Sequence, residues 1–264
     1  MKYYSKEELI NHSKIADDDK IELIKALETV DQSTKYYSFE FTNFLSPSIY
    51  VIAKDYMIPE DFEVSFVGGH EKSERKILVI RPSYMEIKEN ELPITALQIN
   101  YSKKYSNISH GDILGTLMGS GIKREFVGDI YVYDDYAHVI VMDSVVDYLR
   151  MNINKIRHSS ITIEKILLSK IKYKESNYKD IKSTINSNRL DAIIASGFSM
   201  DRKSSKKKVL NDMVKVNHRL ADTPHIELAE GDLISVQGEG RILLDQILGF
   251  SKKNRLKIII KRLV

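Results

Sequence analysis

The sequence predicts a multidomain α+β protein, and three observations support this fold class. At roughly 100–200 residues per domain, 264 residues favour two or three domains over one. Helical and strand-like spacings of apolar residues alternate along the chain. Residues 1–180 carry 24 Lys and Arg against 28 Asp and Glu, whereas residues 181–264 carry 16 against 9. We expect an N-terminal α+β domain over 1–92, a central domain ending in a basic linker over 93–180, and a basic domain with a C-terminal extension over 181–264.

The composition excludes several classes of protein. The chain has no cysteine, which rules out disulfide scaffolds, thiol nucleophiles, zinc ribbons and iron–sulfur clusters and favours a reducing cytoplasm. No apolar segment follows the first eight residues, and no run approaches the ~20 apolar residues that span a bilayer. We therefore expect a cytoplasmic protein that is neither secreted nor inserted in a membrane.

The N-terminal domain is predicted from one helical and one strand-like region. Apolar residues between Lys6 and Val30 recur at three- and four-residue steps, interrupted by three aspartates at 17–19, which predicts two short amphipathic helices. We interpret the aspartates as helix-start carboxylates rather than metal ligands. Ser46-Pro47 predicts the start of a helix that reaches Met57. Residues 63–67 and 76–80 alternate like strands on either side of two glycines.

The central domain is predicted from the order of its elements. A strand through Leu97 and Tyr101 is followed by a helix that begins in Ser109–Asp112, a sequence resembling a capping box. Two strands follow at 130–133 and 137–142, then a second helix with a similar start at Ser144, then a strand near 161–164. This βαββαβ order is the split βαβ arrangement of a ferredoxin-like or RRM-like domain.

The sequence offers little for catalysis. The seven histidines show no pair four residues apart, so they predict no helical metal site. The glycine-rich segment before Lys123 lacks the glycine that a phosphate loop needs directly before its lysine, so we interpret it as a helix end. An aspartate in an Arg-Leu-Asp setting is the nucleophile of pseudouridine synthases, but only 73 residues follow Asp191, and we interpret it as a helix-start carboxylate. We expect no cofactor, no metal and no enzymatic activity.

The strongest local signal is a run of five cations in seven residues at 202–208. If Asp201 caps a helix here, Arg202 and Lys206 lie on one face near the helix N-terminus, which favours phosphate. A helix that begins at Arg189 and ends at Gly197 comes before it. Short strands are predicted at 214–216 and 233–236, with a turn at Gly231.

Two short helices followed by hairpin strands resemble the RNA-binding domain of ribosomal protein S-four, also called the αL motif. The resemblance rests on Arg189-Leu190-Asp191, Gly197, Arg202, Val214-Lys215-Val216-Asn217 and Gly231-Asp232. It implies that the helices present cations to structured RNA, with Arg189, Arg202 and Lys206 at the usual contact positions. The chain departs from the family at Asp201, where Ser is common, and at His218, where Gly is common.

Motifs spread over nearly the whole chain resemble those of the YlmH family of bacterial RNA-binding proteins. They are Phe44-Leu45-Ser46-Pro47, Phe66-Val67-Gly68-Gly69 with Glu74-Arg75, Ile108 to Gly115, Gly121 to Glu125, Gly128-Asp129-Ile130, Gly238 to Arg241, and Lys252 to Arg255. Gly111 departs from the Arg expected in that family. The resemblance implies an N-terminal α+β domain, an RRM-like centre and an S-four domain. It also implies association with the large ribosomal subunit and a role in quality control of stalled nascent chains, with contacts to ribosomal RNA and peptidyl-tRNA.

We therefore predict a monomeric, non-enzymatic protein that binds structured RNA, with no membrane and no small-molecule substrate. The predicted RNA-binding residues are Arg189, Arg202, Lys203, Lys206, Lys207, Lys123, Arg124, Arg241, Lys252, Lys253 and Arg255. A basic edge strand with alternating Leu256, Ile258 and Ile260 is an equal alternative for the C-terminal cations. Tyr131 and Tyr133 could stack bases on the central sheet, although packing is the favoured interpretation.

Two further classes compete with this prediction. An RNA-modifying enzyme that uses the S-four domain for targeting would need a pocket or an activated carboxylate within residues 1–180. A membrane-surface protein would need a broad apolar helix face, and residues 203–213 are too short and too polar to supply one.

Overall fold

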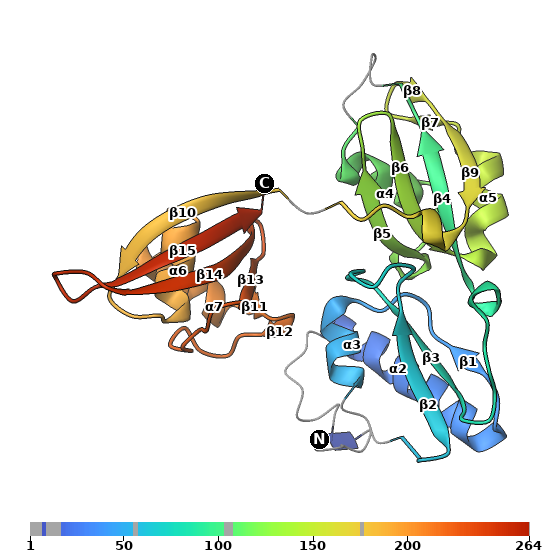
Figure 1. Ribbon diagram of the computed structural model, residues 1–264, viewed down its shortest axis with the longest axis horizontal. Coiled ribbons are helices and arrows are strands. Elements are labelled where there is room, and N and C mark those ends of the chain that lie inside the picture. Colours follow the sequence, from blue (N-terminus) through green and yellow to red (C-terminus); the bar gives the residue numbers. More distant parts are fainter. Residues whose placement is uncertain (1–6, 9–16, 55–57, 103–107, 175–176, 264) are drawn as a thin grey trace. The chain divides into compact units, whose positions relative to one another are not determined.

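The computed structural model describes residues 7–8, 17–54, 58–102, 108–174 and 177–263 (Figure 1). The chain divides into two compact units. Of the described residues, those within 18–174 form the first, here called the N-terminal unit, and 177–263 form the second, the C-terminal unit. None of the helices in the described ranges is both long enough and apolar enough to cross a membrane.

The first part of the N-terminal unit contains two helices and a small antiparallel sheet with the strand order β1-β3-β2. Its elements are α2 (Asp17–Tyr36), β1 (Glu40–Phe41), α3 (Pro47–Ala53), β2 (Phe62–Val67) and β3 (Ile77–Pro82). The aspartates at 17–19 fall at the start of α2, as predicted. The expected helix before them falls mostly outside the described residues. Helix α3 begins at Pro47 but ends at Ala53, so the prediction that it reaches Met57 is wrong.

The second part of the N-terminal unit is a four-stranded antiparallel sheet with two helices. In chain order its main elements are β4 (Ile94–Asn100), α4 (His110–Gly119), β5 (Val127–Val132), β6 (Tyr136–Met142), α5 (Val146–Asn152) and β9 (Thr162–Ile166). The strands lie in the order β5-β6-β4-β9. This confirms the predicted βαββαβ arrangement, because the first and third strands lie side by side at the centre.

Of the two helix caps predicted for this part, only the one at the start of α4 is present. Ser109 and Asp112 form a capping box at α4, in which each side chain accepts from the other residue's backbone amide. The predicted cap at Ser144 is wrong. A short 3-10 turn precedes α5, and Val145 occupies the cap position without a side-chain hydrogen bond.

Several short elements escaped the sequence prediction. The hairpin β7 (Lys155–Ile156) and β8 (Ser159–Ser160) lies between α5 and β9. The 3-10 turns of the N-terminal unit are η1 (Glu89–Glu91), η2 (Arg124–Phe126), η3 (Asp143–Val145), which is the turn before α5, and η4 (Leu168–Lys170).

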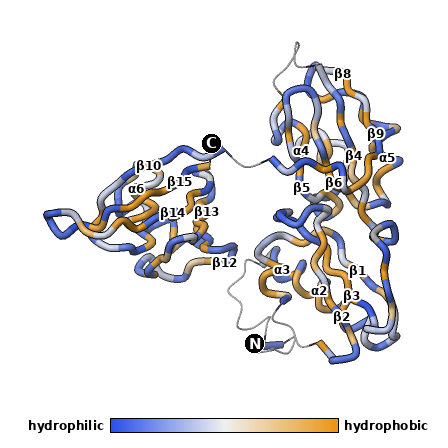
Figure 2. The backbone as a smooth tube through the Cα atoms, viewed as in Figure 1, coloured by the Kyte–Doolittle hydropathy of each residue, from blue (hydrophilic) through white to orange (hydrophobic). Residues whose placement is uncertain are grey.

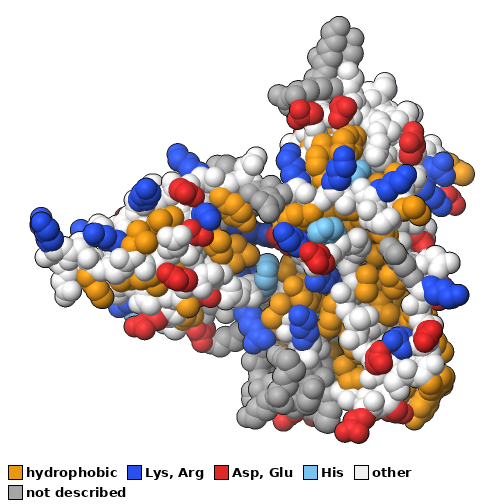
Figure 3. All heavy atoms as spheres, in the orientation of Figure 1, with side chains coloured by type: hydrophobic (Ala, Val, Ile, Leu, Met, Phe, Trp, Pro, Cys, Tyr) orange, Lys and Arg blue, Asp and Glu red, His pale blue; other side chains and the backbone are white. Residues whose placement is uncertain are grey.

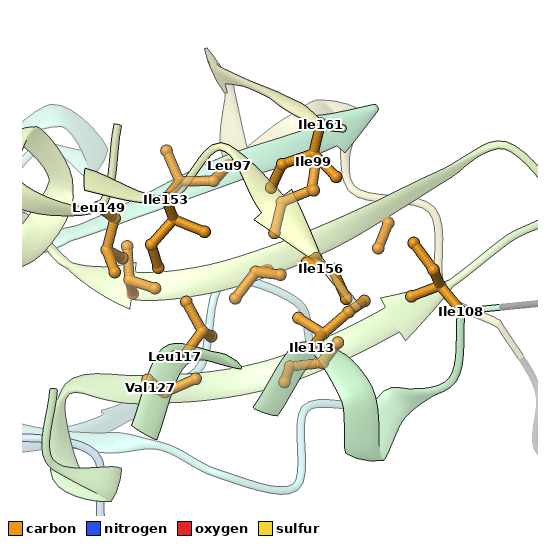
Figure 4. Packing of buried hydrophobic residues seen from close by; sticks show 14 of the residues in the cluster. Leu97, Ile99, Ile108, Ile113, Leu117, Val127, Leu149, Ile153, Ile156 and Ile161 are labelled. Carbon is orange, nitrogen blue, oxygen red and sulfur yellow. The ribbon is translucent and has the colours of Figure 1, made fainter. Parts of the chain in front are cut away.

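One face of the four-stranded sheet packs against α4 and α5. Apolar residues from the sheet meet Ile113 and Leu117 of α4 and Leu149 of α5 (Figure 4). These three side chains are at most 2% exposed. Figure 2 shows the corresponding hydrophobic positions along the strands and the inner sides of the helices.

The second face of the same sheet is covered over part of its area by the first part of the unit. Ala96, Tyr131 and Ile140 share one core with Phe44 and Ile77. Tyr131 is only 7% exposed, so its side chain packs in this core and is not available for stacking a base. Tyr133 stacks on Tyr136, with ring centroids 4.6 Å apart. The packing interpretation of these tyrosines therefore holds.

A partly buried polar cluster, here called the Arg75–Asp129 cluster, joins this covering part to β5. The carboxylate of Asp129 accepts hydrogen bonds from the backbone amides of Glu74 at 2.7 Å and Arg75 at 3.1 Å. The Arg75 guanidinium donates to the carbonyls of Phe44 at 2.7 Å and Val127 at 3.1 Å. Burial lowers the pKa of Arg75. Burial also raises the pKa of Asp129, although the two amide bonds oppose this shift.

The space beside this cluster admits no side chain at Gly128. A Cβ built there would lie 2.7 Å from the ring of Phe44, which is itself buried. Several motifs that carry the family resemblance thus meet at one internal contact: the segments around Phe44, Arg75 and Gly128-Asp129. Their role here is to join two parts of the N-terminal unit.

The C-terminal unit has two helices on one face of a six-stranded antiparallel sheet with the strand order β10-β15-β14-β13-β11-β12 (Figure 1). Its elements are β10 (Tyr178–Ile185), α6 (Leu190–Gly197), α7 (Arg202–Leu210), β11 (Val214–Val216), β12 (Arg219–Leu220), β13 (Leu233–Val236), β14 (Gly240–Phe250) and β15 (Leu256–Leu263). The predicted helices and the strands near 214 and 233 are present. Strand β10, which begins at Tyr178, was missed.

Strand β15 is an interior strand, so the prediction of a basic edge strand is wrong. It pairs with β14 on one side and with β10 on the other over its whole length. Its alternation arises because Leu256, Ile258 and Ile260 face the core under α6, and the intervening residues face away. Gly197 ends α6 where a Cβ would lie 2.7 Å from Ile242, which allows the helix to pack closely on β14.

The β11–β12 hairpin forms despite the departure at His218. Asn217 has φ 47° and His218 has φ 68°, so both turn residues are left-handed, as a two-residue hairpin turn requires. The Asn217 side chain supports this turn. Its amide oxygen accepts from the backbone amide of Leu233 at 2.9 Å, and its amide nitrogen donates to Asp232 at 2.8 Å.

Candidate nucleic-acid interface

The candidate site lies on α6 and α7, which the local sequence positions by capping. Asp201 caps α7: its Oδ1 accepts from the backbone amides of Lys203 and Ser204, each at 2.9 Å. Asp201 therefore caps the helix as well as Ser would. The start of α6 is held by the segment at 224–226. The backbone amides of Leu190 and Asp191 donate to the carbonyls of Ile226 and Pro224, respectively.

The centre of the site is the carboxylate of Asp191, which is fully buried. The Arg202 guanidinium donates to both of its oxygens, at 2.9 and 2.8 Å. Arg189 donates to the same two oxygens, at 3.3 Å each. The ammonium of Lys206 lies 4.0 Å from Oδ2. We call Asp191, Arg189, Arg202 and Lys206 the Asp191 cluster.

The Asp191 cluster has more positive than negative charge. One carboxylate faces three cations, so two positive charges within the cluster have no counter-charge there. The cation side chains keep considerable exposure: 31% for Arg189, 46% for Arg202 and 44% for Lys206. The buried carboxylate thus holds three cations in place while part of each side chain remains accessible to an anion.

The backbone around Asp191 is fixed as firmly as its side chain. The hydroxyl of Ser205, fully buried on α7, donates to the Asp191 carbonyl at 2.8 Å, which ties α7 to α6. Arg189 also contacts the ring nitrogen Nδ1 of His225. These contacts leave the cations of the Asp191 cluster little freedom to rearrange, so less conformational entropy is lost when they bind.

Burial raises the pKa of Asp191, but the hydrogen bonds from Arg202 and Arg189 outweigh it, and the net shift is downward. A carboxylate whose pKa is lower in the folded state stabilises the fold above its unfolded pKa of about 3.9, and this stabilisation is lost as the pH falls through the folded pKa. Thermal melts of the C-terminal unit should therefore show a loss of stability below about pH 4. We call this loss of stability at low pH the acid limb. In Asp191→Asn the acid limb should be smaller, because the titrating carboxylate is absent.

Asp201 is a suitable comparison because its pKa is also lowered, mainly by the hydroxyl of Ser204. Asp201→Asn keeps a good cap and should remove only its own share of the acid limb. An unchanged acid limb in Asp191→Asn would show that the ion pairs at Asp191 do not contribute as described.

The other cations of α7 are the predicted contacts Lys203 and Lys207, and Lys208, which was not predicted as a contact. Lys203 and Lys207 are exposed. Lys208 lies 3.2 Å from Glu239 and is partly buried. Lys203 and Lys207 therefore extend the positive surface along α7, and their contact with RNA remains a prediction.

The C-terminal predicted cations lie mainly on the β14–β15 hairpin. Lys252, Lys253 and Arg255 are exposed in the loop that joins the two strands. Figure 3 shows Lys and Arg side chains at the end of the C-terminal unit where this hairpin closes. Arg241 is partly buried at the start of β14. Two cations of β15 beyond the loop are engaged internally: Lys261 lies 2.8 Å from Asp245, and Arg262 lies over the ring of Phe198.

The two predicted cations of the N-terminal unit differ in environment. Lys123 is exposed. Arg124 donates to the carbonyls of Val127 and Gly128. Burial, reinforced by the nearby Arg75, lowers its pKa to about 10. Arg124 therefore supports the turn before β5, and Lys123 is the accessible cation of the pair.

The sequence had marked Asp191 only as a helix-start carboxylate, and its role as the common partner of three cations was missed. The available signal was a single acidic residue in the first turn of α6 beside the cation-rich start of α7. Within the described ranges, no group of three or more His, Asp or Glu side chains could hold a metal ion. The buried carboxylate of Asp191 is occupied by guanidinium groups, which does not suit a nucleophile.

The chain is similar to known proteins both in sequence and in structure. Residues 88–170 match the family described as "Putative RNA-binding domain in YlmH". The curated Bacillus subtilis (strain 168) protein named ribosome-associated protein quality control protein P2 is 31% identical over 245 residues, which are 93% of this chain and 95% of that protein. The solved structure of cell division protein ylmH from Streptococcus pneumoniae aligns with a TM-score of 0.49 and 23% identity, over 61% of this chain and 98% of that one.

Proposed function

The chain belongs to the YlmH family, and from this premise we propose that it is a non-catalytic RNA-binding protein that works on the ribosome. Its task is quality control of stalled nascent chains in the cytoplasm. It acts as a monomer on the large ribosomal subunit, where it binds folded ribosomal RNA and peptidyl-tRNA. The name of the Bacillus subtilis relative supports the process, and the description of the matched family supports RNA as the partner.

The observation that carries the proposal is the excess of positive charge in the Asp191 cluster. Three half-exposed cations are fixed around one buried carboxylate. Two of them are guanidinium groups, whose planar fork matches a phosphate better than an ammonium does. A preformed cationic surface of this kind recognises folded RNA by its phosphates and shape rather than by base sequence.

The electrostatic character of the binding provides the test. If about five phosphates are neutralised, the logarithm of the binding constant should fall against the logarithm of the salt concentration with a slope near −3.5, taking ~0.7 per contact. The measurement is fluorescence anisotropy with a labelled ribosomal RNA fragment at several salt concentrations. Affinity that does not respond to salt would contradict the proposal.

Variants at the exposed lysines refine this test without disturbing the core. Lys203→Ala and Lys207→Ala should each reduce the slope by about 0.7 and leave the melting temperature unchanged, because both side chains are exposed. Co-sedimentation of the same variants with purified large subunits links RNA affinity to the ribosome. Full retention of both slope and co-sedimentation would remove these two lysines from the interface.

A further inference from the structure

The β14–β15 hairpin carries an apolar tip that the core does not use. Phe250 is 66% exposed and Leu248 is 55% exposed, although both lie near the end of a strand whose earlier residues Ile242 and Leu244 are fully buried. The register of the hairpin shifts between Ile247 and Phe250, and Gly249 there has φ 83°. This irregularity turns the end of β14 away from the packed part of the sheet.

The loop that closes the hairpin is well fixed. The backbone amide of Ser251 donates to the carbonyl of Arg255 at 2.7 Å, and the amide of Asn254 donates to the carbonyl of Ser251 at 2.9 Å. The Arg255 guanidinium donates to the carbonyl of Thr184 at 2.7 Å, which ties the loop to the end of β10. The backbone next to Phe250 is therefore preorganised, so less entropy is lost when a partner binds there.

The charge around the ring identifies the chemistry of its partner. Residues 246–257 contain four cations and no Asp or Glu. Lys252, Lys253 and Lys257 are all exposed. The carboxylate of Glu230 contacts this stretch, where it accepts from the backbone amide of Ile247. An exposed aromatic ring next to several cations fits a nucleic-acid strand, because the phosphates meet the cations and an unpaired base stacks on the ring. Proteins and membranes with an acidic surface would meet the same cations but would not need a stacking face.

The hairpin also lies at the same end of the sheet as the Asp191 cluster. Ile185, the last residue of β10, pairs with Leu256 beside the loop. Arg189 follows four residues later, and four residues of chain span at most about 14 Å. A folded RNA held by the cations of the Asp191 cluster can therefore reach the hairpin.

We propose that the β14–β15 hairpin is a second RNA contact, in which Phe250 stacks on an unpaired base while Lys252 and Lys253 contact the adjacent phosphates. This inference rests on the proposed function and adds to it a preference for RNA with exposed bases. The Asp191 cluster recognises phosphates, and the hairpin distinguishes a looped or bulged RNA from a continuous duplex.

The test uses the full chain and two RNA probes of equal length, a stem-loop with unpaired loop bases and a continuous duplex. Phe250→Ala should weaken binding to the stem-loop about tenfold, the expected effect of losing one base stack. It should leave the salt slope and the affinity for the duplex unchanged. Phe250→Tyr keeps a ring and should restore binding to the stem-loop.

Tyr178→Ala is the matched control. Tyr178 is another exposed aromatic residue of the same sheet, 44% exposed, but it pairs with Leu263 at the opposite end of β10. Seven residues of extended strand place it about 23 Å from Ile185. Its replacement should leave the affinity for both probes unchanged.

The failure of this inference can be distinguished from the failure of the proposed function. If Phe250→Ala binds the stem-loop as wild type does while Arg202→Ala binds weakly, the stacking contact is wrong and RNA binding by the Asp191 cluster stands. An equal loss for stem-loop and duplex would also overturn the stacking contact. If the wild-type chain binds neither probe, both proposals fall.

Discussion

Replacing Arg75 by alanine is expected to destabilise the N-terminal unit by about 1.5–3 kcal/mol, the usual contribution of hydrogen bonds made by a charged group. The carbonyl of Phe44 loses a donor, the carbonyl of Val127 keeps only Arg124, and the positive charge that Glu22 and Asp129 favour is removed. Burial raises the pKa of Glu22, and the charge of Arg75 opposes this shift. Removing Arg75 therefore makes the ionised form of Glu22 less stable as well.

Hydrogen exchange followed by mass spectrometry can measure this effect separately in the two units. Amides of β5 and β6 should exchange much faster in Arg75→Ala, whereas amides of the C-terminal unit should keep wild-type rates. Arg75→Lys keeps the charge but not both hydrogen bonds. Its exchange rates in β5 and β6 should therefore lie between those of the wild type and of Arg75→Ala. Exchange in β5 at the wild-type rate would contradict the role given to this residue.

Arg150→Ala is the control for the Arg75 experiment. Its side chain is 46% exposed and lies 4.0 Å from Asp147, which is itself largely exposed. Surface pairs of this kind contribute about 0–1 kcal/mol. Protection of β5 and β6 should therefore remain at the wild-type level in this variant.

Replacing Arg202 by alanine should weaken RNA binding about tenfold or more, because a charge-assisted bond to phosphate contributes roughly 1.5–3 kcal/mol. It should also lower the stability of the C-terminal unit by about 1–3 kcal/mol, since the buried carboxylate of Asp191 loses the closer of its two guanidinium donors. Binding must therefore be measured well below the melting temperature, with circular dichroism to verify the fold.

The structure offers variants that separate the two effects of Arg202. Arg202→Lys keeps the charge without the planar fork, so it should retain more RNA affinity than alanine does. Lys208→Ala removes a cation from the same helix that is already paired with Glu239, and we expect a change of less than about threefold. A folded Arg202→Ala variant that binds RNA and co-sediments with large subunits like wild type would reject Arg202 as a contact.

Much of the local structure could be predicted because it depends on neighbouring residues. The capping box at Ser109 and the cap at Asp201 each involve residues two or three positions apart. Strand β10 was missed for a related reason. Its only apolar core residues, Ile181 and Ile185, are separated by four positions among polar residues, a spacing that does not distinguish a strand from a helix or a linker.

By itself the sequence determined the α+β class, the βαββαβ order, the two C-terminal helices and the concentration of cations in the last third of the chain. Periodicity, capping and composition are local properties, and these features follow from them. Only the tertiary structure decided which sheet face is covered, that β15 is an interior strand, and that Asp191 gathers three cations. The Asp129–Arg75 contact joins residues 54 positions apart and the Arg202–Asp191 pair joins residues 11 apart. Such pairings are fixed by the packing of whole elements, which no local pattern encodes.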